Sequence, residues 1–424
     1  MADIPFPRGV RDLMPNEARF RNEFLKRVED SFQRFGFLSI DTPTFEPLKL
    51  LNSKNSIGED AKLIFEIKDQ DLGLRYDHTV SLARYMGMHQ ELPLPFKRYY
   101  IGKAWRRDEP QRLRYWEFTQ ADIDIVGGTS PFTDAEVIGA ASTALESVGI
   151  DHYVDINDRA LVDAVIEKFG VNAETVPSIL RIIDKLDKIG EDKVADMLRA
   201  LKLSNEIVDQ IMSFIALKGS NNEKLDYVDA LLGSNGKTAQ LRGVLELVSQ
   251  YGLKSRIAVN FSVVRGLDYY TGLVWEYKSA DRDVGSSIGG GGRYDRLIGL
   301  YSGKQMPAVG TSFGIDKLLF MLDYSKSPDH TYAKAFVATV KDSNYAYALK
   351  VANRLRASGI GAEINLATRN LSHQFAYANS LKFRYALIIG DAEEKANNVK
   401  IRNLDSGDEQ SMGIEEAIKT INGN

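Results

Sequence analysis

Two runs of alternating residues, 98–106 and 115–126, flank the highly charged segment from Arg106 to Arg114. Side chains along a strand alternate between the two faces of a sheet, so each run reads as a strand. Two strands joined by so short a segment predict a hairpin. The hairpin alone does not indicate a function, because charged residues cost little in an exposed turn.

The returning strand carries polar residues along one whole face. Its core-facing positions are apolar: Ala121, Ile123 and Ile125. Gln120, Asp122 and Asp124 then share the opposite face. Neighbouring carboxylates repel one another unless cations, donors or a ligand lie between them. We expect Arg106, at the end of the partner strand, to supply part of that charge.

A second cluster of polar residues lies at 265–272, with the sequence Arg-Gly-Leu-Asp-Tyr-Tyr-Thr-Gly. The flanking runs, 257–264 and 273–277, are rich in β-branched and aromatic residues and read as strands. A strand end that presents arginine, aspartate and tyrosine together is suited to bind a small polar substrate. The alternative is a hairpin whose polar groups satisfy one another at the surface.

Residues 74–80 read as a short strand with Asp77 and Thr79 on one face. A carboxylate and a hydroxyl so placed can accept hydrogen bonds from an ammonium group. His78 falls on the other face, where packing or surface exposure is the expected role. The run Gly289–Gly292 indicates close approach of the backbone to a ligand or to another strand, or alternatively a flexible turn.

The spacing of apolar residues predicts a helix over 16–35, followed by a strand over 37–40. Helical periodicity dominates from Leu161 to Gln250, and we expect a helical insertion from about 174 to 250. A further helix is expected over 314–322. These elements assign residues 1–325 to one domain.

From Ala333 onward, strands alternate with helices, which predicts βαβ units and a largely parallel sheet. The expected strands are Val337–Val340, Ala362–Leu366, Tyr385–Ile389 and Val399–Leu404. The expected helices are Tyr345–Ala357, Leu371–Leu381 and one from Ile414. We assign residues 331–424 to a separate α/β domain.

The bulk composition narrows the class of protein. A chain of 424 residues can hold two or three domains, and its net charge of −4 argues against indiscriminate coating of nucleic acid. Without cysteines there are no disulfides or thiolate metal sites, and five scattered histidines make a zinc enzyme an unfavourable hypothesis. Neither a signal peptide nor an apolar run of membrane-spanning length is found, so we expect a cytoplasmic protein.

The charged hairpin resembles the second motif of class II aminoacyl-tRNA synthetases. The resemblance implies that Arg106 and Arg114 bind ATP phosphates, Asp108 contacts the adenine or ribose, and Phe118 stacks on adenine. The glutamine and the acid four residues later resemble the histidyl-tRNA synthetases, which implies that Gln120 and Asp124 contact histidine.

Other segments resemble the same family. The resemblance of residues 265–272 to the family implies that Arg265 binds the substrate carboxylate and the α-phosphate. It also implies that Tyr269 and Tyr270 lie at the imidazole. The family's acid-x-threonine implies that Asp77 and Thr79 hold the α-amino group. Members of the family more often have leucine at the position of His78. In the family, the glycine run that corresponds to Gly289–Gly292 forms the floor of the amino-acid pocket.

The third motif of the class departs from the family pattern. Lys317 stands where the family has an ATP-binding arginine, and lysine lacks the planar, forked donors of that residue. Either ATP binds more weakly, or another arginine such as Arg293 compensates.

The resemblance runs from Gly9 to the last helix. It implies an antiparallel-sheet catalytic domain with a helical insertion, and a C-terminal α/β anticodon-binding domain. The implied activity is ATP-dependent formation of histidyl-adenylate and transfer to tRNA(His), with Arg106 and Arg265 catalytic and Mg²⁺ arriving with the nucleotide. The helix and strand at 16–40 imply a homodimer.

Three alternatives remain open. The first is a catalytically silent paralogue that acts as a histidine sensor or regulatory subunit. The second is an RNA-binding accessory module, which the lysine at position 317 favours. The third is a class II enzyme for another amino acid.

Overall fold

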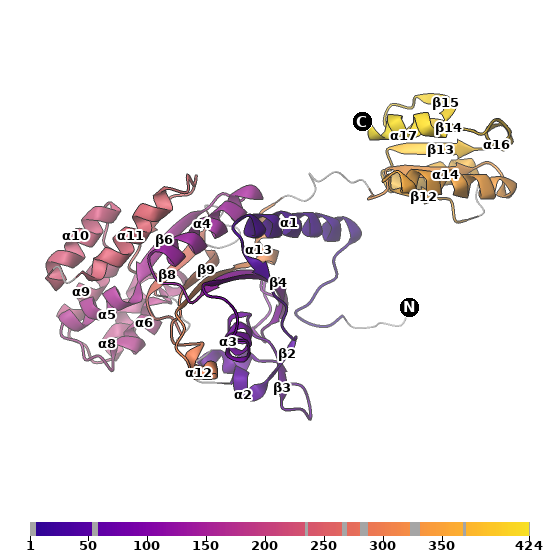
Figure 1. Cartoon of the computed structure of the whole chain (residues 1–424). Coiled ribbons are helices and arrows are strands. Elements are labelled where there is room, and N and C mark those ends of the chain that lie inside the picture. The colour runs from indigo at the N-terminus through magenta and orange to yellow at the C-terminus, as the bar shows by residue number, and fades with distance from the viewer. Residues whose placement is uncertain are drawn as a thin grey trace. The chain divides into compact units, whose positions relative to one another are not determined.

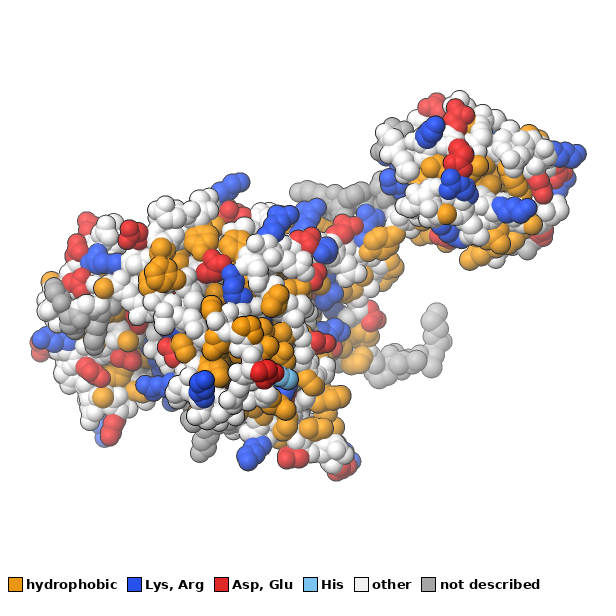
Figure 2. All heavy atoms as spheres, viewed as in Figure 1, with side chains coloured by type: hydrophobic (Ala, Val, Ile, Leu, Met, Phe, Trp, Pro, Cys, Tyr) orange, Lys and Arg blue, Asp and Glu red, His pale blue; other side chains and the backbone are white. Residues whose placement is uncertain are grey.

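The computed structural model describes residues 6–52, 58–233, 236–264, 269–279, 287–322, 331–367 and 370–423. The chain divides into two compact units, Met1–Asp323 and Tyr324–Asn424. In the described part of the chain, no helix is both long and apolar enough to cross a membrane. On the face shown in Figure 2, acidic and basic side chains are interspersed over both units.

An eight-stranded, mostly antiparallel sheet forms the centre of the first unit (Figure 1). Its strands, in spatial order, are β1 (Leu38–Ser39), β4 (Phe96–Trp105), β5 (Glu117–Val126), β10 (Ala308–Gly314), β9 (Ser287–Arg293), β8 (Leu273–Lys278), β6 (Tyr153–Asp158) and β7 (Ile257–Val259). Only the pairs β1–β4 and β6–β7 are parallel. The predicted hairpin is confirmed as β4 and β5, whose ten residues pair throughout.

Helices cover one face of this sheet. The predicted N-terminal helix is confirmed as α1 (Pro15–Arg34), which packs beside α4 (Phe132–Ser147). Both helices contribute buried residues to the core that contains Ala121, Ile123 and Ile125. The alternation predicted for β5 is therefore confirmed, with its apolar face in this core.

The segment between β6 and β7 is helical. It contains α5 (Arg159–Lys168), α6 (Val176–Ile183), α7 (Leu186–Ile189), α8 (Glu191–Ala200), α9 (Asn205–Ile215), α10 (Asn221–Leu232) and α11 (Lys237–Ser249). Buried residues from these helices, such as Ile179, Ile211 and Val244, belong to the same hydrophobic core as the sheet. The helical segment therefore packs as part of the first unit.

A smaller group of elements lies against the other face. It comprises β2 (Phe45–Pro47), α2 (Leu48–Leu51), the 3₁₀ helix Gly58–Leu63, β3 (Leu72–Leu74), α3 (Thr79–Met88) and α12 (Gly299–Ser302). The prediction of a strand over 74–80 is wrong, because β3 ends at Leu74 and α3 begins at Thr79. The Asp77 carboxylate accepts the Val80 N–H at 3.0 Å, which satisfies a free donor at the start of α3.

Strand pairing also settles two alternatives from the sequence. The runs flanking 265–272 do not form a hairpin, because β6 lies between β7 and β8. The glycine run is part of the paired strand β9 and is not a flexible turn. A Cβ at Gly291 would lie 2.1 Å from the Gly310 carbonyl oxygen, so the glycines permit close approach of the neighbouring strand.

The second unit has a five-stranded sheet in the order β12 (Ala362–Ile364), β11 (Ala335–Thr339), β13 (Tyr385–Ile389), β14 (Asn398–Asn403) and β15 (Glu409–Gly413). Its helices are α14 (Tyr345–Ala357), α15 (Leu371–Ser380), α16 (Asp391–Ala396) and α17 (Ile414–Asn422). The α/β prediction is confirmed, but the sheet is mixed: β14 and β15 run antiparallel. The prediction of a largely parallel sheet was wrong because the connection between β13 and β14, residues 390–397, is too short for the crossover that a parallel pair requires.

Candidate active site

A cavity of about 880 Å³ opens in the first unit, lined by β5, β9 and β10 and by the loops before β5 and α3. Eleven of the side chains expected to contact histidine or ATP line it: Asp77, Thr79, Arg106, Asp108, Arg114, Phe118, Gln120, Asp124, Tyr269, Tyr270 and Lys317. Arg265 lies outside the described residues. Segments more than two hundred residues apart in the sequence therefore meet at one cavity.

Asp124 lies at the buried end of the polar face of β5. The strand register places Arg98 of β4 directly opposite, and its guanidinium nitrogen lies 2.5 Å from an Asp124 carboxylate oxygen. Arg98 is only 1% exposed. Arg106 was expected to supply part of the charge on this face, and its charge acts on Asp77; the cation beside Asp124 is Arg98, which the sequence did not single out.

Tyr294, a residue that the sequence did not single out, also holds Asp124. Its hydroxyl donates a hydrogen bond to the Asp124 carboxylate. Burial raises the Asp124 pKa to about 6, although Arg98 and the Tyr294 hydrogen bond both act to lower it. Burial and the nearby Asp124 charge raise the pKa of Tyr294. Asp124 is therefore ionised at neutral pH, at a cost that its partners offset only in part.

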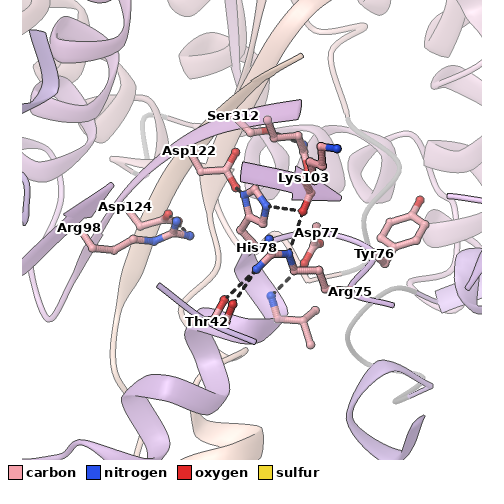
Figure 3. A network of polar contacts seen from close by, with 12 residues as sticks. Thr42, Arg75, Tyr76, Asp77, His78, Arg98, Lys103, Asp122, Asp124 and Ser312 are labelled. Atoms are coloured by element: carbon pink, nitrogen blue, oxygen red, sulfur yellow. Dashed lines mark hydrogen bonds and ion pairs between the residues drawn. The ribbon is translucent and has the colours of Figure 1, made fainter. Parts of the chain in front are cut away.

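Asp77 and Asp122 approach the cavity from different elements (Figure 3). Burial raises the Asp77 pKa. Asp122 Oδ2 lies 2.8 Å from Nδ1 of His78, a residue only 2% exposed. The expected packing role of His78 agrees with its burial against Tyr100, but the start of α3 also turns its ring toward Asp122 of β5.

Several buried acceptors of this cavity have no hydrogen-bond partner among the described residues. They are Asp77 Oδ2, Gln120 Oε1, Asp122 Oδ1 and Thr311 Oγ1. Buried polar atoms without partners are costly and uncommon in folded proteins. A ligand with several N–H groups and positive charge would satisfy them.

The aromatic residues enclose the same space. Tyr269 and Tyr270 are buried, with ring centroids 4.8 Å apart. A Cβ at Gly292 would lie 2.7 Å from the Tyr270 ring, so the glycine strand leaves room for that ring. Burial raises the Tyr269 pKa, and Thr79 is its hydrogen-bond partner. The Tyr269 phenol therefore remains protonated at neutral pH.

Arginines gather at the other end of the cavity. The Arg106 guanidinium lies 4.2 Å from the Tyr76 ring centroid and 5.1 Å from that of Phe118. Arg114 Nε lies 3.8 Å from the Asp108 carboxylate. Cations beside an aromatic ring form a surface suited to a base and its phosphates.

Lys317 lies at this end as well, on α13 (Ile315–Met321). Its ammonium group donates a 2.9 Å hydrogen bond to the Ser287 carbonyl. Burial, together with the charge of Arg114, lowers its pKa. Arg293 does not compensate for the lysine, because its side chain is buried in ion pairs with Asp134 and Asp295.

Known proteins resemble this chain over both of its units. The model of the family "Histidyl-tRNA synthetase" matches residues 9–318, and that of the "Anticodon binding domain" matches residues 334–424. A histidine–tRNA ligase of Korarchaeum cryptofilum is 39% identical over 99% of this chain and 98% of its own length. One from Clostridium tetani is 34% identical over 97% of both chains.

A solved structure has the same fold over the whole length. The crystal structure of histidyl-tRNA synthetase from Nostoc sp. PCC 7120 superposes with a TM-score of 0.86 at 28% sequence identity, and covers 100% of both chains. Both the catalytic and the anticodon-binding parts have counterparts among these relatives. The chain therefore belongs to the histidyl-tRNA synthetase family of class II aminoacyl-tRNA synthetases.

Proposed function

We propose that this chain activates L-histidine with ATP, giving histidyl-adenylate and pyrophosphate, and then transfers the histidyl group to the 3′ end of tRNA(His). The observation that carries the proposal is the cavity itself. One end presents buried acceptors without partners, and the other presents arginines beside aromatic rings. The first end suits an amino acid rich in N–H groups, and the second suits a nucleotide.

At the amino-acid end, Asp77 and Thr79 bind the α-ammonium group. Gln120, Asp124 and the phenols Tyr269 and Tyr270 surround the imidazole. Above about pH 6 the Asp124 carboxylate is ionised and accepts a hydrogen bond from an imidazole nitrogen. A site built to hydrogen-bond a polar side chain rejects analogues that lack it by about 10⁴–10⁵, which removes the need for an editing site.

At the nucleotide end, Arg106 and Arg114 bind the phosphates of ATP. Asp108 contacts the adenine or ribose, Phe118 stacks on adenine, and Lys317 adds a positive charge at the phosphates. In the described part of the chain, no three acidic or histidine residues cluster to hold a metal ion. We propose that Mg²⁺ arrives with the nucleotide, held through the ATP phosphates, where it would supply charge neutralisation.

The reaction needs no general base, because the histidine carboxylate is already an anion. The protein contributes alignment of the carboxylate with the α-phosphorus, and cations that stabilise the charge developing there. We assign this catalytic role to Arg106 and to Arg265. We also assign Arg265 to the histidine carboxylate.

We divide the chain functionally into a catalytic domain, 1–325 with its helical insertion at about 174–250, and an anticodon-binding domain, 331–424. We further propose that it acts in the cytoplasm as a homodimer. Supporting dimerisation, β1 is an edge strand, and Leu38 on that strand is exposed, as are Met14 and Phe45 nearby in sequence. Light scattering should give about twice the 47.4 kDa chain mass.

The test is charging of a tRNA(His) transcript with labelled histidine. We expect Asp124→Asn to lower kcat/KM for histidine at least about 100-fold, because the imidazole loses an ionised acceptor. Asp151→Asn, the same change at an exposed position of this unit, should leave charging within twofold of the unchanged protein. If Asp124→Asn charged tRNA(His) as efficiently as the unchanged protein, Asp124 could not be assigned to the imidazole pocket.

A histidine sensor without synthetase activity is the main competing function. It would bind histidine in the same acceptor-lined cavity but would not form the adenylate. The arginine-rich end of the cavity and the matched anticodon-binding domain favour the enzyme. Histidine binding without charging of tRNA would favour the sensor instead.

A further inference from the structure

His78 occupies an unusual position behind the wall of the cavity. Its Nδ1 lies 2.8 Å from Asp122 Oδ2, and its Nε2 lies 3.3 Å from the Lys103 carbonyl oxygen. The ring also packs edge-on against Tyr100, with centroids 4.5 Å apart. Both ring nitrogens of this buried histidine therefore face oxygen atoms (Figure 3).

The hydrogen bonds of the ring define its protonation. A carbonyl oxygen only accepts, so Nε2 must carry a proton to bond with Lys103. An ionised carboxylate also only accepts, so Nδ1 must carry a proton to bond with Asp122. Either neutral tautomer of the ring would direct a lone pair at one of these oxygens. An imidazolium satisfies both contacts.

The charges around the cavity point to the same state. Three buried carboxylates, Asp77, Asp122 and Asp124, lie close enough to influence one another. Arg98 forms an ion pair with Asp124, and the charge of Arg106 acts on Asp77. Asp122 thus needs a cation of its own.

The other cations close to this wall are committed elsewhere. Arg75 donates to the carbonyl oxygens of Lys103 and Thr42, and its guanidinium covers the Tyr100 ring. The Lys103 ammonium group forms an ion pair with Glu117. Among the described residues, the ring of His78 is the side chain in direct contact with Asp122.

We propose that His78 is a positively charged positioning residue, which holds Asp122 so that its second oxygen binds the ammonium group of the substrate. Asp122 Oδ1 is buried at the cavity without a partner among the described residues, as is Asp77 Oδ2. The two carboxylates together form the ammonium site. This inference rests on the proposed function, and it adds a residue pair that selects amino acids with a free, charged amino group.

The charge of His78 can be measured without any enzymatic activity. Solid-state NMR of protein labelled with ¹⁵N-histidine reports the protonation of each ring nitrogen. The chain has only five histidines, and the spectrum of His78→Asn identifies the signals of the buried ring. We expect both nitrogens of His78 to be protonated at pH 7.5. A ring with one unprotonated nitrogen would overturn the proposal.

The role in binding is tested by titration calorimetry with histidine and with imidazolepropionate, which lacks the amino group. His78→Leu should weaken histidine binding at least about tenfold and change imidazolepropionate binding less than twofold. His78→Asn, which keeps a donor for Asp122, should restore part of the loss. His89→Leu, at an exposed histidine, is the control and should bind both ligands normally.

Equal weakening of both ligands by His78→Leu would mean that the residue only maintains the fold, and would overturn the proposal. Histidine binding unchanged by His78→Leu would also overturn the proposal. Pyrophosphate exchange by the unchanged protein separates this inference from the proposed function. Absence of exchange would refute the enzyme function, whereas the NMR spectrum and the two-ligand comparison would still decide the role of His78.

Discussion

Gly310→Ala is expected to disable the imidazole pocket without touching a polar residue. Gly310 pairs with Asp124 across β5 and β10. A Cβ at this position would lie 1.9 Å from Asp124 Oδ1, 2.5 Å from its Cγ and 2.9 Å from the Ile123 carbonyl oxygen. The backbone of a central strand cannot retreat by so much, so the Asp124 carboxylate must move.

The size of the effect follows from these distances. Ordinary contact begins near 3.4 Å, so relieving the overlap displaces the carboxylate oxygen by roughly 1.5 Å. A hydrogen bond stretched by that much is lost, and each bond to a charged group contributes about 1.5–3 kcal/mol. Loss of the Tyr294 bond, together with a misplaced acceptor for the imidazole, predicts about 3 kcal/mol, or roughly 100-fold weaker histidine binding.

Titration calorimetry with histidine measures this loss directly. Gly314→Ala is the matched control, because Gly314 ends the same strand, has φ of −81°, and has no atom within 4 Å of an added Cβ. It should bind histidine within twofold of the unchanged protein. If a folded Gly310→Ala variant bound histidine within threefold, Asp124 could not be the residue that positions the imidazole.

Three further outcomes are expected. Lys317→Met should raise the KM for ATP about tenfold by removing a cation from the nucleotide end, whereas exposed Lys304→Met should not; equal KM values would exclude Lys317 from the ATP site. Burial raises the Asp158 pKa to about 6, so its ionisation lowers the free energy of unfolding as pH rises from about 4 to 6. Asparagine keeps the N-cap of α5 without titrating; the stability of Asp158→Asn relative to the unchanged protein should therefore grow by up to about 3 kcal/mol between pH 4 and pH 7. Urea denaturation followed by tryptophan fluorescence reports this difference, and a difference independent of pH would contradict the burial argument. Ser220→Ala removes the capping box of α10 and should cost about 1 kcal/mol in the same assay; a change in pyrophosphate exchange would show that the helical segment acts on the site.

The polar face of β5 could be predicted because it depends on strand periodicity alone. Once Ala121 and Ile123 face the core, Gln120 and Asp122 must face away. The same hairpin also contained the signal for Arg98: pairing Trp105 with Glu117 aligns Arg98 with Asp124. Alternation alone does not identify that buried cation, because its alignment with Asp124 depends on the register of the hairpin.

The local structure at Asp77 was predicted wrongly although its signal was present. Asp77 lies three residues before Val80, whose N–H it accepts, and Leu82 and Met86 then follow at helical spacing in a buried cluster. These are the marks of a helix start. The longer helical period from Thr79 to Met88 outweighs the short alternation over 74–80.

Other parts of the site depend on contacts that no local pattern specifies. Tyr294 reaches Asp124 only because β9 and β10 pair beside β5, which brings together segments 170 residues apart. The requirement for glycine at 310 follows from the same pairing. Strand order is set by tertiary packing, and so residues delivered by distant strands are seen only in the folded structure.

ATP–pyrophosphate exchange with each of the twenty amino acids, in the absence of tRNA, tests the central claim most directly. The account predicts exchange with histidine and with no other amino acid, because the buried acceptors of the cavity match its ammonium and imidazole groups. Exchange with a different amino acid would contradict the assignment of the pocket. Absence of exchange, in protein that still binds histidine, would contradict the proposed activity and favour a histidine sensor.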